Sequence, residues 1–307
     1  MISVANAPIS YGAFELTVGI YPNVPDGEGV LDRVRDAGYV GIDLGPVGYL
    51  GLGDTLASNL ESRGLGLTGG YLELPFHDSD NMPKSLEELS ELIEAFEAAA
   101  PVNERLGLPP ARPTIAVMSQ PHRRAMPGRA VNERELGYTD QQWETFAVNA
   151  ERAAGLCRDR GFEPVFHNET GTNVEAPWEI EKVMELTSFD VCLDTGHLIA
   201  CGGDPVASLL KWRDRVTHIH VKSAARAKMQ ELIDRGGDVE DIWADFEQAF
   251  DHISRVAPAP APTKQSSWLA PFAAPGRRRA SASARTSDFS LSPSGKTRRA
   301  ISSARVA

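Results

Sequence analysis

The chain is dominated by short apolar runs that alternate with longer amphipathic segments. The runs are short and several are rich in β-branched residues, which predicts strands, and the segments between them have helical periodicity. Strands are predicted at residues 2–5, 39–44, 66–72, 113–118, 163–168, 189–194 and 216–221. Helices are predicted at residues 29–37, 84–107, 139–160, 176–186, 205–213 and 224–235. Strands separated by helices pair in parallel, so the pattern indicates an α/β fold.

Two architectures fit this alternation, a (β/α)8 TIM barrel and a doubly wound sheet. A doubly wound dinucleotide fold usually carries G-x-G-x-x-G after its first strand, but residues 7–12 read APISYG. The glycine-rich run at 45–51 lacks the Lys and Ser/Thr of a phosphate loop. We therefore predict a TIM barrel and no organic cofactor site.

Two helix starts carry capping signals. Ser85 is followed three residues later by Glu88, which is the spacing of a capping box. The next long helix is expected to open at Thr139.

The C-terminal segment differs sharply from the rest. Residues 251–307 hold ten Lys and Arg, two Asp and no Glu, and are rich in Ala, Pro, Ser and Arg. We expect an incomplete barrel over residues 1–250, lacking its eighth β/α unit, followed by a disordered tail. The tail could be a basic RNA- or membrane-binding arm, an inert extension, or the product of a frame shift. The frame shift is favoured, because the composition changes where the last strand should stand.

Charge and composition exclude several classes of protein. The net charge of the whole chain is −11 although its tail is basic, so the barrel is strongly acidic and nucleic acid is not expected as its partner. No stretch approaches the roughly 18 apolar residues of a membrane helix. Three cysteines cannot form a disulfide framework, which indicates the cytoplasm. A homo-oligomer is left open.

Polar residues gather where the predicted strands end, which is where TIM barrels place their chemistry. Glu169, Asp194 and His220 close three consecutive strands. Two carboxylates and an imidazole suit a divalent ion such as Mn²⁺, Mg²⁺, Co²⁺ or Zn²⁺. The alternative is that the histidines belong to the core or rim and that Asp194 caps the next helix.

Three further features have a functional and a structural interpretation. Arg123 and Arg124 could bind an anionic substrate, but a solvated loop is favoured. Trp178 could line a sugar pocket or pack under the rim. Cys192 is expected to be a small buried residue rather than a nucleophile.

In combination these motifs resemble the sugar phosphate isomerase/epimerase superfamily, with its xylose isomerase-like barrel, near the branch of the inosose (2-keto-myo-inositol) dehydratases. The resemblance covers roughly residues 3–245. It rests on the segments GIDLG at 41–45, HNETGT at 167–172, LDTGH at 193–197 and HIHVK at 218–222.

The resemblance implies one divalent metal ion held by Glu169, Asp194, His220 and a second Glu. It also places His197 and Lys222 at positions that contact substrate, so that Glu169, His197 and Lys222 are the expected catalytic residues. The second Glu would stand on the eighth strand and is absent from residues 251–307. We therefore expect weak metal binding and little activity from this chain.

The implied activity is isomerisation or epimerisation of a sugar or sugar phosphate, by proton abstraction next to a carbonyl through a metal-stabilised enediolate. Dehydratase relatives usually carry His where Glu169 stands, which favours an isomerase or epimerase over an inosose dehydratase-like lyase. An inactive remnant of either enzyme is the other alternative. Endonuclease IV-type repair enzymes resemble the same barrel, but Ser223 stands where an acidic residue is common, and no Asp-x-His run follows.

Overall fold

Seven parallel strands form one sheet in this computed structural model, which describes residues 3–14, 17–20 and 24–242. The strands are β1 (Ala5–Asn6), β2 (Gly41–Asp43), β3 (Gly66–Leu74), β4 (Arg112–Val117), β5 (Val165–His167), β6 (Asp190–Asp194) and β7 (Val216–His220). They are ordered β1 to β7 without a reversal. A doubly wound sheet reverses its strand order, so the TIM-barrel prediction is confirmed.

The helices lie between the strands. They are α1 (Gly27–Asp36), α2 (Gly53–Glu61), α3 (Met82–Arg105), α4 (Pro121–Ala125), α5 (Asp140–Asp159), α6 (Pro177–Leu186), α7 (Thr195–Ala200), α8 (Pro205–Trp212) and α9 (Arg226–Asp234), with short 3-10 turns at Pro8–Tyr11, Arg129–Val131 and Arg134–Leu136. All six predicted helices are present. The sequence patterns missed α2, α4 and α7, of which α4 and α7 have six residues or fewer.

The two capping predictions had different outcomes. Thr139 caps α5 in a capping box with Gln142, as a helix start there requires. The prediction for Ser85 was wrong, because α3 begins three residues earlier at Met82 and Ser85 is buried inside it. Pro83 in the first turn fits this earlier start, since the first turn needs no backbone N–H from it.

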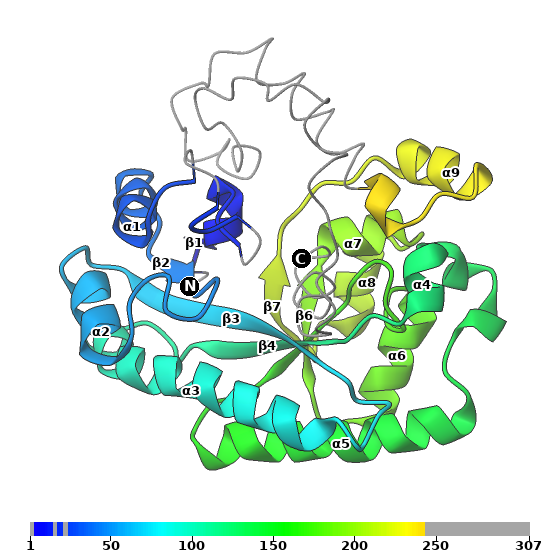
Figure 1. Cartoon of the computed structure of the whole chain (residues 1–307), viewed down its shortest axis with the longest axis horizontal. Coiled ribbons are helices and arrows are strands. Elements are labelled where there is room, and N and C mark those ends of the chain that lie inside the picture. The colour runs from blue at the N-terminus through cyan, green and yellow to red at the C-terminus, as the bar shows by residue number, and fades with distance from the viewer. Residues whose placement is uncertain (1–2, 15–16, 21–23, 243–307) are drawn as a thin grey trace, which may run out of the picture.

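The sheet curls into an open half-barrel with β1 and β7 at its edges (Figure 1). Among the described residues no eighth strand is present, and β7 pairs with β6 alone. Ile219 on β7 is 42% exposed and Val221 just beyond it is 47% exposed. The predicted tail at 251–307, and the domain boundary before it, lie outside the described residues.

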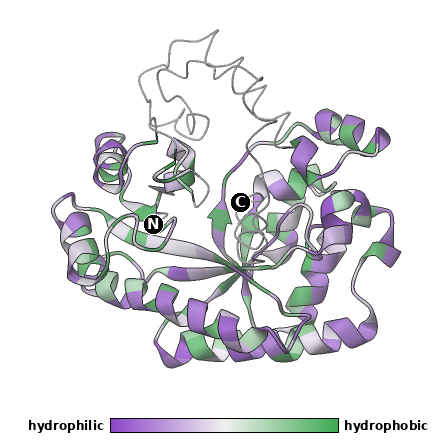
Figure 2. Ribbon diagram, in the orientation of Figure 1, coloured by the Kyte–Doolittle hydropathy of each residue, from purple (hydrophilic) through white to green (hydrophobic). Residues whose placement is uncertain are grey.

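The core lies between the sheet and the helices on its outer side. Phe76, Phe146, Phe166 and Phe189 are buried there in edge-to-face and tilted contacts. Hydrophilic and hydrophobic residues alternate along α3 and α5, as expected of helices with one face on a sheet (Figure 2). Within the described ranges, no helix has the length and apolar character needed to cross a membrane.

Candidate active site

Asp194 ends β6 and is the N-cap residue of α7, as the structural interpretation of this residue predicted. Its Oδ1 accepts hydrogen bonds from the backbone N–H groups of Gly196 and His197, each at 3.0 Å. Its Oδ2 lies 2.9 Å from Nζ of Lys222. The helix start therefore fixes the orientation of the carboxylate and leaves the second oxygen for the site.

Lys222 and His197 form a short chain of contacts with Asp194. Nζ of Lys222 lies 3.3 Å from Nε2 of His197, and Nδ1 of His197 lies 3.1 Å from the hydroxyl of Thr170. The backbone N–H of Thr170 also donates to Nδ1 of His197 at 3.3 Å, so Nδ1 is an acceptor and the ring is neutral. Burial lowers the pKa of His197 to about 3, which favours the neutral ring.

Asp194 and Lys222 stabilise each other's charge. Burial raises the pKa of Asp194, but Lys222, His197 and His167 outweigh burial, so the pKa is well below its ordinary value. Burial lowers the pKa of Lys222, but Asp194 outweighs it and the net shift is upward. Both groups are therefore charged near neutral pH.

Glu169 follows β5 and is fully buried. The hydroxyl of Tyr71 donates to Oε2 of Glu169 and lies 3.2 Å from Oε1 of Glu73. Oε1 of Glu169 has no hydrogen-bond partner among the described residues. Burial, followed by the charge of Glu73, raises the pKa of Glu169 well above its ordinary value.

Sequence reasoning missed Tyr71 and gave no role to Glu73. Both lie on β3, two residues apart, so strand alternation puts them on one face. That alternation was the available signal.

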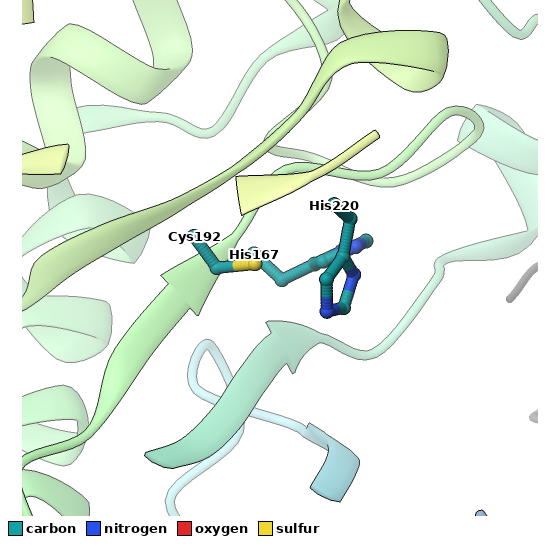
Figure 3. Close-up of side chains that lie close together, drawn as sticks. All are labelled: His167, Cys192 and His220. Carbon is teal, nitrogen blue, oxygen red and sulfur yellow. The ribbon is translucent and has the colours of Figure 1, made fainter. Parts of the chain in front are cut away.

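His167 lies at the centre of two groups of possible metal donors. Within the described residues, donor atoms of His167, Cys192 and His220 lie within 4.8 Å of one another, and so do those of His167, Asp194 and His197. Figure 3 shows the side chain of Cys192 directed toward His167, with the rings of His167 and His220 close together. The ring centroids are 5.0 Å apart.

The three ligands predicted from sequence are not brought to a single point. Nδ1 of His220 lies 3.9 Å from Oδ2 of Asp194, and Glu169 lies beside His167, with Oε2 3.9 Å from Nδ1. His220 also faces Asp43 of β2, with Nε2 3.8 Å from Oδ2. The ligand set of Glu169, Asp194 and His220 stays a prediction.

The chemistry of these donors fits a divalent cation. Oε1 of Glu169 and Nδ1 of His167 are buried without hydrogen-bond partners among the described residues, and such orphaned atoms are costly unless a ligand meets them. Carboxylate oxygens and imidazole nitrogens are ligands for Mn²⁺, Co²⁺ and Zn²⁺.

The prediction of a solvated loop at Arg123 and Arg124 was wrong, because both residues lie in α4, where Nη2 of Arg124 is 2.8 Å from Oε1 of Glu240. Arg123 is fully buried, with Nη2 2.9 Å from Oε1 of Glu175 and Nη1 2.6 Å from Oε1 of Glu179. Glu175 also accepts from the backbone N–H of Gly171 at 2.7 Å. The guanidinium therefore supports the loop that carries Glu169. The sequence gave no sign of this, because its partners lie more than fifty residues away.

Trp178 and Cys192, the other two side chains with alternative interpretations, are packed against the protein. Nε1 of Trp178 donates to the carbonyl of Ala130 at 2.8 Å, and Arg134 lies 4.9 Å from the centre of its ring. Cys192 is fully buried and free, as expected. Packing is therefore the observed role of Trp178.

Residues 31–256 match the sequence profile of the xylose isomerase-like TIM barrel family. The match covers most of the chain, and the strand order agrees with it. The chain belongs to this family. The resemblance identified from the strand-end motifs is thereby confirmed.

Curated relatives of this family member are enzymes. The chain is 29% identical over 210 residues to an inosose dehydratase of Geobacillus kaustophilus, an alignment covering 67% of this chain and 64% of that relative. It is 32% identical over 121 residues to an inosose dehydratase of Lacticaseibacillus casei, covering 38% of this chain and 41% of that relative. The chain thus spans less than two thirds of either relative.

Solved structures support the fold alone. An AP endonuclease of family 2 from Brucella melitensis is 16% identical with a TM-score of 0.51, covering 72% of this chain and 80% of its own. An L-ribulose 3-epimerase is 16% identical with a TM-score of 0.50, covering 72% of this chain and 70% of its own.

Proposed function

We propose that the chain is a metal-dependent isomerase or epimerase of a sugar, sugar phosphate or cyclitol, with Glu169, His197 and Lys222 as catalytic residues and Asp194, His220 and Glu169 as metal ligands. The proposal is supported by the position of these side chains at or just beyond the carboxyl ends of β5, β6 and β7, where Oδ2 of Asp194 lies 2.9 Å from Nζ of Lys222 and 3.9 Å from Nδ1 of His220. When bound, a divalent ion would polarise the substrate carbonyl and stabilise negative charge on substrate oxygens.

Glu169 is the proposed base. Its carboxylate is buried, its pKa is raised, and Oε1 is available to accept a proton from the carbon next to the carbonyl. Tyr71 holds the other oxygen and so fixes the orientation of the carboxylate.

Lys222 is the proposed donor to a substrate oxygen. Its ammonium group is charged and is anchored by Asp194, which leaves other N–H directions for substrate. His197 lies beside Lys222, with Nε2 3.3 Å from Nζ, and its neutral ring adds no competing positive charge.

A lyase acting on an inosose is the second candidate, because both curated relatives described above carry that name. Removal of the same proton followed by loss of a hydroxyl group would give this outcome from one site. Glu169 favours the isomerase. An inactive remnant is favoured by the absence of Glu from residues 251–307.

We also propose a reducing compartment, the cytoplasm, as the location. The three buried cysteines are free in the structure, which supports this proposal.

The test is incubation of the purified 307-residue chain in D₂O with Mn²⁺, Mg²⁺, Co²⁺ or Zn²⁺ and a panel of ketoses, aldoses and an inosose. We expect deuterium at the carbon next to the carbonyl, with an isomeric product. Loss of one water from the product would support the lyase, and no deuterium in any substrate would support the remnant.

Glu169→Gln should reduce deuterium incorporation about 10²–10⁴-fold, the usual contribution of a general base. Glu97→Gln is the matched control, because Glu97 pairs with Arg160 on the surface. Equal rates in Glu169→Gln and the unaltered chain would remove Glu169 from the mechanism.

A further inference from the structure

We propose that His167, Cys192 and His220 form a binding site for a thiophilic metal ion, Zn²⁺ or Co²⁺, inside the half-barrel. One donor atom from each residue lies within 4.8 Å of the other two. The site differs from the proposed ligand set of Glu169, Asp194 and His220 and shares only His220 with it. The inference rests on the proposed function only through that shared residue.

The sheet itself creates this arrangement. His167 and Cys192 are directly paired across β5 and β6, so their side chains lie on the same side of the sheet. Cys192 is two residues before Asp194 on β6, and Asp194 is paired with His220 on β7. The thiol therefore lies two residues deeper along the strand than the Asp194 carboxylate, on the same face.

One ring nitrogen of His167 faces a carboxylate, which leaves the other nitrogen available to a metal ion. Nε2 lies 3.4 Å from Oδ2 of Asp194, while Nδ1 is buried with no hydrogen-bond partner among the described residues. If Nε2 carries the proton toward the carboxylate, the lone pair of Nδ1 is free. Histidine ligands of metal ions commonly direct their other nitrogen to a carboxylate in this way.

Packing alone explains the grouping of His167, Cys192 and His220 less well than metal binding does. A small buried cysteine needs no partner, but a fully enclosed imidazole nitrogen without one is costly. His167 is only 2% exposed, so bulk water does not readily meet that nitrogen. A metal ion would engage the nitrogen and the thiol at once.

The donor set also selects among metals. Two imidazoles and a thiolate suit Zn²⁺ or Co²⁺, whereas Mg²⁺ and Mn²⁺ prefer oxygen ligands. On binding, the thiol of Cys192 gives up its proton to solvent and the sulfur donates its lone pair to the metal.

The test is titration of the full chain with Co²⁺, followed by absorption spectroscopy. A thiolate ligand gives a near-ultraviolet sulfur-to-cobalt charge-transfer band. We expect this band to saturate in the unaltered chain, to be lost in Cys192→Ala, and to remain in Cys157→Ala. Cys157 is the matched control, since it is also free and fully buried but lies in α5.

Visible cobalt bands without charge transfer would overturn this inference and leave the proposed carboxylate site intact, with Glu169→Gln then reducing those bands. No cobalt binding at all would overturn both. If Cys192→Ala does not fold, X-ray absorption of the zinc-loaded unaltered chain decides the matter. A sulfur neighbour at about 2.3 Å supports the site, and nitrogen or oxygen neighbours alone, at about 2.0–2.2 Å, overturn it.

Discussion

Oδ2 of Asp194 lies 2.9 Å from the ammonium nitrogen of Lys222, while Oδ1 of the same carboxylate is held by the first backbone N–H groups of α7. The carboxylate is thus fixed at one oxygen and paired with a cation at the other. A metal ion that binds Oδ2 must share that oxygen with Lys222 or displace it. Lys222 therefore links metal binding to catalysis in the proposed function.

Replacement of Lys222 by Met separates the effect of Lys222 on metal binding from its effect on catalysis. We expect tighter Mn²⁺ binding, because the ion no longer competes with an ammonium group for Asp194. Turnover should fall about 10²–10³-fold, the usual loss when a donor to developing charge is removed. Calorimetric titration and the deuterium assay measure the two quantities. Weaker Mn²⁺ binding in the variant would show that Lys222 supports the metal site.

Replacement of Arg123 by Met should destabilise the chain by about 3–5 kcal/mol, because it leaves two carboxylates buried without their cation. Arg105→Met is the matched control, because its partner Glu61 is exposed and such pairs contribute about 1 kcal/mol or less. Urea denaturation of both variants compares the free energies of unfolding. Similar losses in both would mean that the buried network adds nothing beyond a surface pair.

Protonation of His77 should lower the stability of the fold as pH falls. Burial lowers the pKa of His77 below the ordinary value of 6.5, and its Nδ1 lies 3.1 Å from the hydroxyl of Tyr138, which can donate to the neutral ring. Because the folded pKa is the lower one, the stabilisation is present above pH 6.5 and is lost as pH falls through the folded pKa. Nuclear magnetic resonance titration gives that pKa, and urea denaturation at several pH values gives the stability.

His77→Gln is the comparison for this effect. The variant should lose less stability than the unaltered chain between pH 6.5 and the folded pKa. Identical pH profiles in the two proteins would exclude His77 as a cause.

Much of the fold followed from the sequence, and the reasons are local. Most strands lie within short apolar runs, although β1 overlaps its predicted range only at Ala5, and Thr139 starts α5 through a side chain three residues from its partner. The start of α3 was misplaced because Ser85 carries the same local signal inside the helix. Short helices such as α7 lack enough turns to show a period, although Asp194 provides its cap.

The sequence predicted only those parts of the site that strand order and strand alternation determine. These rules placed Asp194 and His220 on neighbouring strands, where they lie together. They do not show the depth of a side chain within the half-barrel, so the closeness of Cys192 to His167 and His220 was missed. They also do not reveal partners distant in sequence, such as Glu175 and Glu179 around Arg123.

The proposed function requires the carboxyl ends of β5, β6 and β7 to hold one divalent ion. Titration of the unaltered 307-residue chain and of Asp194→Ala with Mn²⁺, followed by calorimetry, tests it most directly. We predict saturable binding of one ion per chain, weak because no Glu is available from residues 251–307, and its loss in Asp194→Ala. No binding by the unaltered chain, or equal binding by a folded Asp194→Ala variant, would contradict the proposed metal site.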